Sequence, residues 1–222
     1  MTDYSATRDR VEHYFDRSAT KVWERLTSDA PVSRIRQTVR EGRDRMRALM
    51  LSRLPQDLRG ARVLDAGCGA GQMTAELAAR GADVVAVDIS PALIDIARRR
   101  LPESDTRKVR FASGDMLCET HGAFDYVLAM DSLIYYGPAD ITDALHRLGD
   151  RTAQSVVFTV APRTPFLMAF WGMGKLFPRS DRSPTMVPHA YSGLARATKG
   201  QLARVDRVSR GFYISECLEY RP

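Results

Sequence analysis

The sequence predicts an α/β fold built on a doubly wound, mostly parallel sheet. Short apolar runs typical of buried strands alternate with segments whose apolar residues recur at helical spacing. The first strand is expected to end at 64, and the next four to begin at 83, 109, 124 and 154. Helices are expected between these strands at 71–80, 90–101 and 138–149. Two final strands, 203–209 and 211–219, joined by a tight turn at Arg210-Gly211, should form an antiparallel hairpin, which brings the expected sheet to seven strands.

The most informative segment is VLDAGCGAG at 63–71. Its glycines Gly67, Gly69 and Gly71 permit a sharp turn and let a ligand approach the backbone closely. The segment joins the end of a strand to the start of a helix, which is where open α/β sheets bind ligands. A nucleotide-like ligand is therefore expected at this loop.

The spacing excludes two common phosphate-binding loops. A dinucleotide loop requires a third glycine at position 72, where Gln72 stands, and a P-loop requires a Gly-Lys-Ser/Thr ending that is absent here. An acidic residue two positions before the first glycine suits a cationic ligand. The D-x-G-x-G-x-G string resembles motif I of the class I methyltransferases, which use S-adenosylmethionine. This resemblance implies that the cofactor is bound by Asp65, Gly67, Cys68, Gly69 and Gly71.

Three further segments resemble later motifs of the same class. Asp88 follows the strand DVVAV, where its carboxylate would accept hydrogen bonds from both ribose hydroxyls, and Ile89 would pack on the adenine. Asp115, after the third strand, would accept a hydrogen bond from the adenine amino group. FDYVLAMDS at 124–132 resembles the fourth strand. The expected cofactor set is completed by Met116 and Met130.

Other interpretations of these residues stay open. Glycine-rich loops also occur in domains that only bind ADP-like ligands, and Asp88 could serve as a helix N-cap. Cys68 is interpreted as a small filler rather than a nucleophile. The three cysteines show no metal-ligand spacing, which fits a reducing cytosol.

Charge is unevenly distributed along the 222 residues, whose net charge is +6. Residues 1–60 carry +4, residues 61–160 carry −4, and residues 161–222 carry +6. Basic regions that flank an acidic core favour an acidic substrate or an anionic surface, although solvated arginine-rich faces would give the same balance. No basic stretch interleaved with aromatic residues points to nucleic acid. The polar N-terminus and the lack of a long apolar run predict a cytoplasmic protein without a signal peptide or membrane span.

Residues 1–60 are predicted to form a helical lid before the methyltransferase domain at 61–222. Two amphipathic stripes support this interpretation: Val11, Tyr14, Phe15, Val22, Trp23 and Leu26, and then Ile35, Val39, Met46, Leu49 and Met50. Simple packing of such stripes on the domain is the alternative. Class I methyltransferases commonly place a lid at this point over cofactor and substrate.

An insertion at 162–188 is expected to cap the acceptor. It combines aromatic residues, including Phe166, Phe170 and Trp171, with basic ones such as Arg163 and Lys175. A large flat acceptor that bears carboxylates would use both components. A helix that lies on a membrane surface would have a similar composition.

Nearly the whole chain resembles the magnesium-protoporphyrin IX O-methyltransferase family of (bacterio)chlorophyll synthesis. The resemblance rests on YFD…VWERL…VSRIRQTVREGRDRM, on the insertion from APRTP to LFP, and on the terminal FYISECLE. It implies methyl transfer from S-adenosylmethionine to a propionate carboxylate, with magnesium chelatase as a transient partner. The basic flanks would serve that contact or a peripheral contact with the anionic surface of the photosynthetic membrane. A different bulky apolar acceptor, such as a quinone precursor, and a non-catalytic binding protein are the alternatives.

The chain departs from the family pattern at two positions. Thr27 replaces a lid tyrosine, and Tyr135 stands where plant and cyanobacterial members typically have histidine. A carboxylate nucleophile is already ionised at neutral pH, so it requires no strong base. Tyr135 and Tyr136 are therefore expected to orient the acceptor by hydrogen bonds, with ordinary packing as the alternative.

Overall fold

A computed structural model describes the chain except for residues 1–3, 17–23, 25–26, 28–30 and 176–183. Its centre is a sheet with strand order β3-β2-β1-β4-β5-β8-β7. The strands are β1 (Arg62–Ala66), β2 (Asp83–Asp88), β3 (Val109–Ser113), β4 (Phe124–Ala129), β5 (Thr152–Pro162), β7 (Gln201–Arg210) and β8 (Tyr213–Arg221). The first five are parallel, and β8 and β7 are antiparallel additions. A two-residue strand, β6 (Pro188–His189), also pairs with β5.

The expected α/β, doubly wound architecture is confirmed, including the terminal hairpin. The hairpin is longer than predicted, and its turn lies at Gly211-Phe212, one residue later than expected. Gly211 has a φ of 57°, a backbone conformation that glycine adopts without strain.

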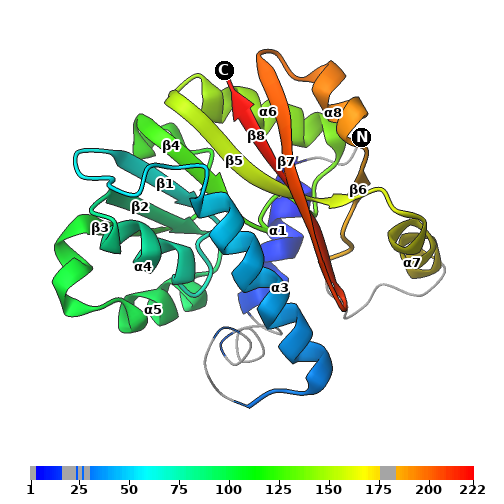
Figure 1. The fold of residues 1–222 in the computed structure, drawn as a ribbon, viewed down its shortest axis with the longest axis horizontal. Helices are drawn as coiled ribbons and strands as arrows, with labels where there is room; N and C mark the ends of the chain where they lie inside the picture. The colour runs from blue at the N-terminus through cyan, green and yellow to red at the C-terminus, as the bar shows by residue number, and fades with distance from the viewer. Residues whose placement is uncertain (1–3, 17–23, 25–26, 28–30, 176–183) are drawn as a thin grey trace.

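Helices cover both faces of the sheet (Figure 1). They are α1 (Tyr4–Tyr14), α3 (Arg34–Leu51), α4 (Gln72–Ala79), α5 (Pro91–Arg100), α6 (Pro138–Gly149), α7 (Pro165–Lys175) and α8 (Tyr191–Ala197), with short helices η2 (Glu103–Lys108) and η3 (Glu119–His121). Strand side chains alternate between two cores: Leu64 packs with α6, whereas Val63 packs with α3 and α4. Burial of both strand faces explains the continuous apolar runs in the sequence.

The two N-terminal stripes have different outcomes. Val11 and Phe15 are buried against Leu93 and Ile96 of α5, and Met46 and Met50 are fully buried on the inner face of α3. Ile35, predicted to be buried, is 57% exposed because it lies in the first turn of α3, beyond the sheet. Val22, Trp23 and Leu26 lie outside the described residues.

Candidate functional site

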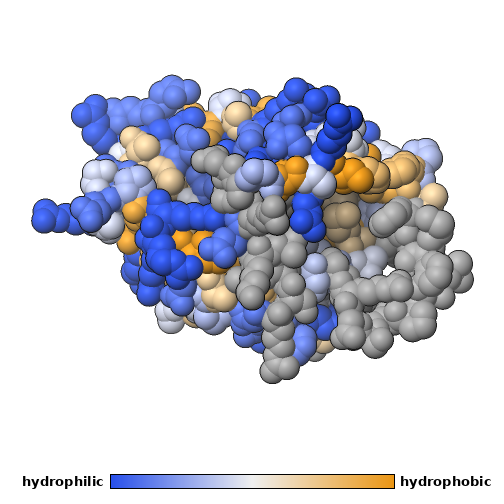
Figure 2. All heavy atoms as spheres, turned by 90° about the horizontal axis from the view of Figure 1, so that it is seen from below, coloured by the Kyte–Doolittle hydropathy of each residue, from blue (hydrophilic) through white to orange (hydrophobic). Residues whose placement is uncertain are grey.

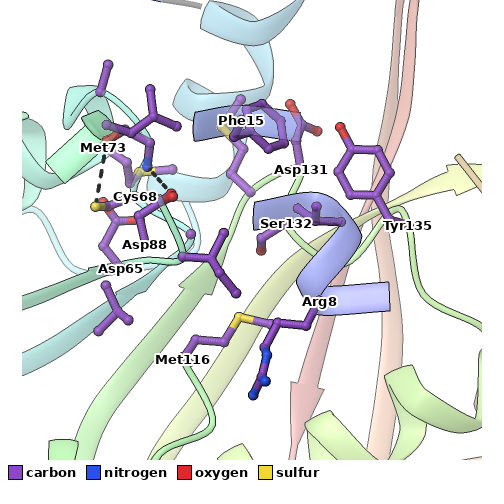
Figure 3. A pocket seen from close by; sticks show the side chains of 18 of the residues that line it. Arg8, Phe15, Asp65, Cys68, Met73, Asp88, Met116, Asp131, Ser132 and Tyr135 are labelled. Carbon is purple, nitrogen blue, oxygen red and sulfur yellow. Dashed lines mark hydrogen bonds between the residues drawn. The ribbon is translucent and has the colours of Figure 1, made fainter. Parts of the chain in front are cut away.

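A pocket opens at the carboxyl ends of β1, β2 and β4, and α1 and α3 form its other walls (Figure 3). Asp65 and Asp88 lie on one side of it, and Asp131 and Tyr135 lie on the opposite side. This is the position at which parallel α/β sheets bind ligands. The lining includes every expected site residue except Gly71: Asp65, Gly67, Cys68, Gly69, Asp88, Ile89, Asp115, Met116, Met130, Tyr135 and Tyr136.

The glycine loop is attached to the end of β2. Backbone N–H groups of Gly67 and Cys68 donate to the Val87 carbonyl at 2.8 and 2.9 Å, and Gly69 donates to the Asp88 carboxylate at 2.7 Å. Gly67 and Gly69 have φ values of 85° and 53°, which favour glycine at both positions. The loop is therefore fixed to β2, with the backbone of Gly67 and Gly69 lining the pocket.

Gly71 has a packing role in the structure. A Cβ on this residue would lie 2.9 Å from the Cβ of Ala97, so glycine allows α4 to start close to α5. Its predicted contact with the cofactor stays a prediction.

Asp88 is not the N-cap of the following helix. Ser90 occupies that position, and its hydroxyl accepts from the Leu93 N–H at 3.3 Å. Asp88 instead accepts from the Gly69 and Ser90 N–H groups through different oxygens. Its carboxylate lines the pocket while it holds the loop.

Two buried carboxylates give this side of the pocket its electrostatic character. Burial raises the pKa of Asp65 to about 7, and burial raises the pKa of Asp88 to about 6. The Thr74 hydroxyl donates to Asp65 at 2.6 Å and opposes part of this effect. A cation bound between them would favour their ionised forms and recover part of the desolvation cost.

Helix α1 is fixed to Asp115. The Tyr4 hydroxyl donates to one oxygen of this carboxylate at 2.9 Å, and Arg8 pairs with the other at 3.5 Å. Tyr4 also stacks on Tyr136 with ring centroids 4.8 Å apart. Asp115, the proposed hydrogen-bond acceptor for the adenine amino group, is therefore also bound by the helix that covers the pocket.

Tyr135 and Tyr136 have different surroundings. Tyr136 is buried and lies in the stack with Tyr4, whereas Tyr135 faces the pocket and contacts the edge of Phe15. Burial raises the pKa of both hydroxyls well above the ordinary value for tyrosine. Both side chains are therefore protonated at neutral pH and suited to donate hydrogen bonds.

A base for the reaction could come from a histidine, but His146 and His189, which follow β4 in the chain, do not line this pocket. His189 is buried and bonds the Tyr136 carbonyl at 3.0 Å, and His146 accepts from the Lys199 N–H at 2.9 Å. Burial lowers the pKa of His189. Cys68 is buried, which raises the pKa of its thiol and fits the interpretation as a filler.

A buried polar cluster at the end of β4 was not predicted from the sequence. Asp131 forms an ion pair with Arg43 and accepts from Thr159 and Tyr213, both at 3.1 Å. Asp131 has a φ of 56°, which is uncommon for a residue other than glycine. These residues come from α3, β5 and β8, so no local motif could have brought them together.

The predicted acceptor insertion is described only in part. Residues 176–183 and the side chains of Phe170 and Trp171 lie outside the description. Phe166 is 54% exposed, and no insertion residue that the structure describes lines the pocket. Its role in acceptor binding stays a prediction.

Comparisons with known proteins agree with this geometry. A model of the methyltransferase domain matches residues 63–154, and one of the magnesium-protoporphyrin IX methyltransferase C-terminus matches residues 129–222. The magnesium-protoporphyrin O-methyltransferase of Rhodobacter capsulatus is 65% identical over 222 residues, which cover 100% of this chain and 99% of that protein. The chain belongs to the magnesium-protoporphyrin O-methyltransferase family.

A sequence comparison and a structure comparison with Synechocystis PCC 6803 also support the assignment to this family of class I methyltransferases. The enzyme of the same name from Synechocystis sp. is 27% identical over 94% of both chains. A crystal structure of magnesium protoporphyrin IX methyltransferase from Synechocystis PCC 6803 with bound SAH has 25% identity and a TM-score of 0.80, covering 97% of this chain and 100% of that one. Within the described part of the chain, no helix combines the length and hydrophobicity needed to cross a membrane.

Proposed function

We propose that this protein transfers the methyl group of S-adenosylmethionine to a propionate carboxylate of magnesium-protoporphyrin IX. The product is the monomethyl ester, an intermediate of (bacterio)chlorophyll synthesis. The observation that carries this proposal is the 65% identity, over the full chain, to a magnesium-protoporphyrin O-methyltransferase. A quinone precursor as acceptor is less well supported because that whole-chain relative carries the porphyrin enzyme's name.

The pocket has the chemistry that the cofactor requires. The cofactor supplies an electrophilic methyl group on a cationic sulfonium. Asp65 and Asp88 provide two carboxylates whose charge a cation would stabilise, and the open glycine loop permits close approach. The Ser132 hydroxyl is a buried pocket atom without a hydrogen-bond partner in the described structure, as expected of a wall that meets a polar ligand.

The proposed contacts follow the expectations from the sequence. Asp88 accepts from the ribose hydroxyls, Asp115 accepts from the adenine amino group, and Ile89 packs on the ring. Tyr135 donates to one oxygen of the acceptor carboxylate and aligns the other with the methyl group and sulfur. Alignment and exclusion of water then lower the barrier, without a side chain that must remove a proton.

A direct assay tests the proposed reaction. Wild-type protein is incubated with methyl-labelled S-adenosylmethionine and magnesium-protoporphyrin IX, and the pigments are separated by chromatography. Label in a monomethyl ester that alkali removes supports the proposal. Label that is absent from the porphyrin, or that resists alkali, contradicts it.

The surface also supports contact with an anionic membrane. Ile35 and Phe212, 57% and 61% exposed, flank the place where Gly211 lies against Thr38. Arg34 and Arg36 adjoin Ile35 in the chain, and Arg210, which pairs with Glu41 at 2.8 Å, precedes Phe212 by two residues. Figure 2 shows hydrophobic patches beside strongly hydrophilic surface on one face of the molecule. Exposed apolar side chains next to cations are typical of peripheral membrane binding.

Vesicle co-sedimentation tests this contact. Binding to phosphatidylglycerol vesicles should exceed binding to phosphatidylcholine, weaken as salt rises, and fall in Phe212→Ser. Equal binding to both lipids at all salt concentrations would contradict a charge-driven contact.

Transfer of the porphyrin from magnesium chelatase is the second partner proposal. It rests on the family resemblance and on the poor solubility of the porphyrin in water. Faster methylation when porphyrin is delivered by chelatase than when it is added free would support it. Equal rates would contradict it.

A further inference from the structure

Three arginines line the pocket: Arg8 on α1, and Arg43 and Arg47 on α3. Arg43 and Arg47 are four residues apart on one helix, so they project from the same helical face. None of the three belongs to the expected cofactor or catalytic set. Their partners distinguish them.

Arg8 and Arg43 have carboxylate partners in the pocket wall. Arg8 pairs with Asp115 and also with Asp9, its neighbour in the chain. Arg43 pairs with Asp131, which is held in turn by Thr159 and Tyr213. These two cations are largely neutralised by the protein itself.

Arg47 differs. Its side chain is 16% exposed, and its guanidinium donates at 2.8 Å to Asp44, one turn earlier on the same helix. Asp44 is 46% exposed, and such i,i+3 pairs at the surface contribute little. No pocket carboxylate that the structure describes forms an ion pair with Arg47. The pocket wall thus holds a mostly buried cation whose partner faces solvent.

We propose that Arg47, beside the Asp131-held Arg43, binds a carboxylate of a bound ligand. The planar guanidinium can hold both oxygens of a carboxylate, and burial strengthens such a pair. The proposal rests on the proposed function, in which the amino-acid end of the cofactor and the propionates of the acceptor are both carboxylates. Ligands with and without each carboxylate distinguish the two sources.

The central variant is Arg47→Gln, with Arg45→Gln as matched control. Arg45 is exposed on the same helix, so its replacement makes the same charge change away from the pocket. Binding is measured by calorimetry or fluorescence for S-adenosylhomocysteine and for methylthioadenosine, which lacks the amino-acid end. It is also measured for magnesium-protoporphyrin IX, its monomethyl ester and its dimethyl ester.

Arg47→Gln should lose about ten- to a hundredfold in affinity for the ligand that bears the carboxylate. Loss for S-adenosylhomocysteine with unchanged methylthioadenosine binding assigns the carboxylate to the cofactor. Loss for the free diacid with unchanged dimethyl ester binding assigns it to the acceptor. An equal loss for the monomethyl ester then identifies the propionate that does not react.

The proposal is overturned if Arg47→Gln weakens acids and their carboxylate-free counterparts alike, or acts no more strongly than Arg45→Gln. If Arg47→Gln does not fold, Arg47→Lys, which keeps the charge, replaces it in the same comparison. Its loss of affinity should be smaller and confined to the same carboxylate-bearing ligands. Because these are binding measurements, they hold even if the wild-type protein forms no ester. A failure of the proposed reaction is thereby distinguished from a failure of the Arg47 site.

Discussion

The two sides of the pocket differ in how the sequence encodes them. The side with Asp65 and Asp88 comes from the carboxyl ends of β1 and β2 and from the loops that follow them, because these neighbouring parallel strands end at the same edge of the sheet. The side formed by α1 and α3 depends on how two helices pack, and it brings together residues as distant as Tyr4 and Asp115. The first side carries buried carboxylates suited to a cation, and the second carries arginines suited to an anion. Local motifs therefore predict the proposed cofactor side, whereas tertiary packing decides the proposed acceptor side.

The largest expected effect concerns the cost of burying Asp65. Its pKa in the folded protein, about 7, lies above the ordinary value of 3.8, so the folded protein keeps a proton that the unfolded chain releases. The stabilisation from this proton is complete below pH 3.8 and is lost as pH rises through 7. Asp65→Asn cannot ionise and should be more stable than wild type at pH 8, by up to about 4 kcal/mol at 1.4 kcal/mol per pKa unit. Urea unfolding without cofactor at pH 4 and pH 8 measures this difference.

The exposed Asp95→Asn serves as the control for this comparison. It should unfold like wild type at both pH values. An Asp65→Asn variant no more stable than wild type at pH 8 would show that the cofactor side carries no such electrostatic cost.

The next effect tests the proposed ribose contact. Asp88→Ala should weaken binding of S-adenosylmethionine by about 1.5–3 kcal/mol, because hydrogen bonds to a charged group are lost. Ser90→Ala, which removes the helix cap and leaves the carboxylate, should bind nearly as well as wild type. If calorimetry on a folded Asp88→Ala protein gives unchanged affinity, Asp88 serves only to hold the glycine loop.

Tyr135→Phe tests the chemistry on the opposite side. Loss of one positioning hydrogen bond should lower turnover about ten- to a hundredfold, equivalent to roughly 1.4–2.7 kcal/mol. With saturating cofactor, the wild-type rate should stay nearly flat from pH 7 to 9, because the acceptor is already a carboxylate. A rise in rate with a pKa near 7 that disappears when His146 or His189 is replaced would show that a base is required.

A smaller effect is expected where α1 meets Asp115. Tyr4→Phe removes one hydrogen bond to that carboxylate, which keeps its contacts with Arg8 and the Leu117 N–H, so the packing of α1 over the pocket should lose only about 0.5–1.5 kcal/mol. Amide hydrogen exchange in residues 4–14 should become faster, while the strands keep their protection. Unchanged exchange in α1 would show that the stack on Tyr136 is sufficient to hold the helix.

Features of this protein that depend on local sequence patterns could be predicted, whereas features that depend on contacts between distant residues could not. The alternation of strands and helices, the terminal hairpin and the glycine loop follow from apolar periodicity and from backbone needs that leave a local signature. Asp131 left none, since its partners Arg43 and Tyr213 are distant in the chain. Ile35 matches a helical stripe but is exposed, because periodicity identifies a helical face and not how far the sheet extends beneath it.

We expect the carboxyl ends of the strands and their loops to bind the cofactor, and the α1–α3 side to receive the acceptor. A crystal structure with S-adenosylhomocysteine and magnesium-protoporphyrin IX bound together tests it most directly. The ribose is expected at Asp88, the adenine near Ile89 and Asp115, and a propionate beside Tyr135 with one oxygen facing the sulfur. A macrocycle bound outside this pocket, with both propionates far from the sulfur, would contradict it.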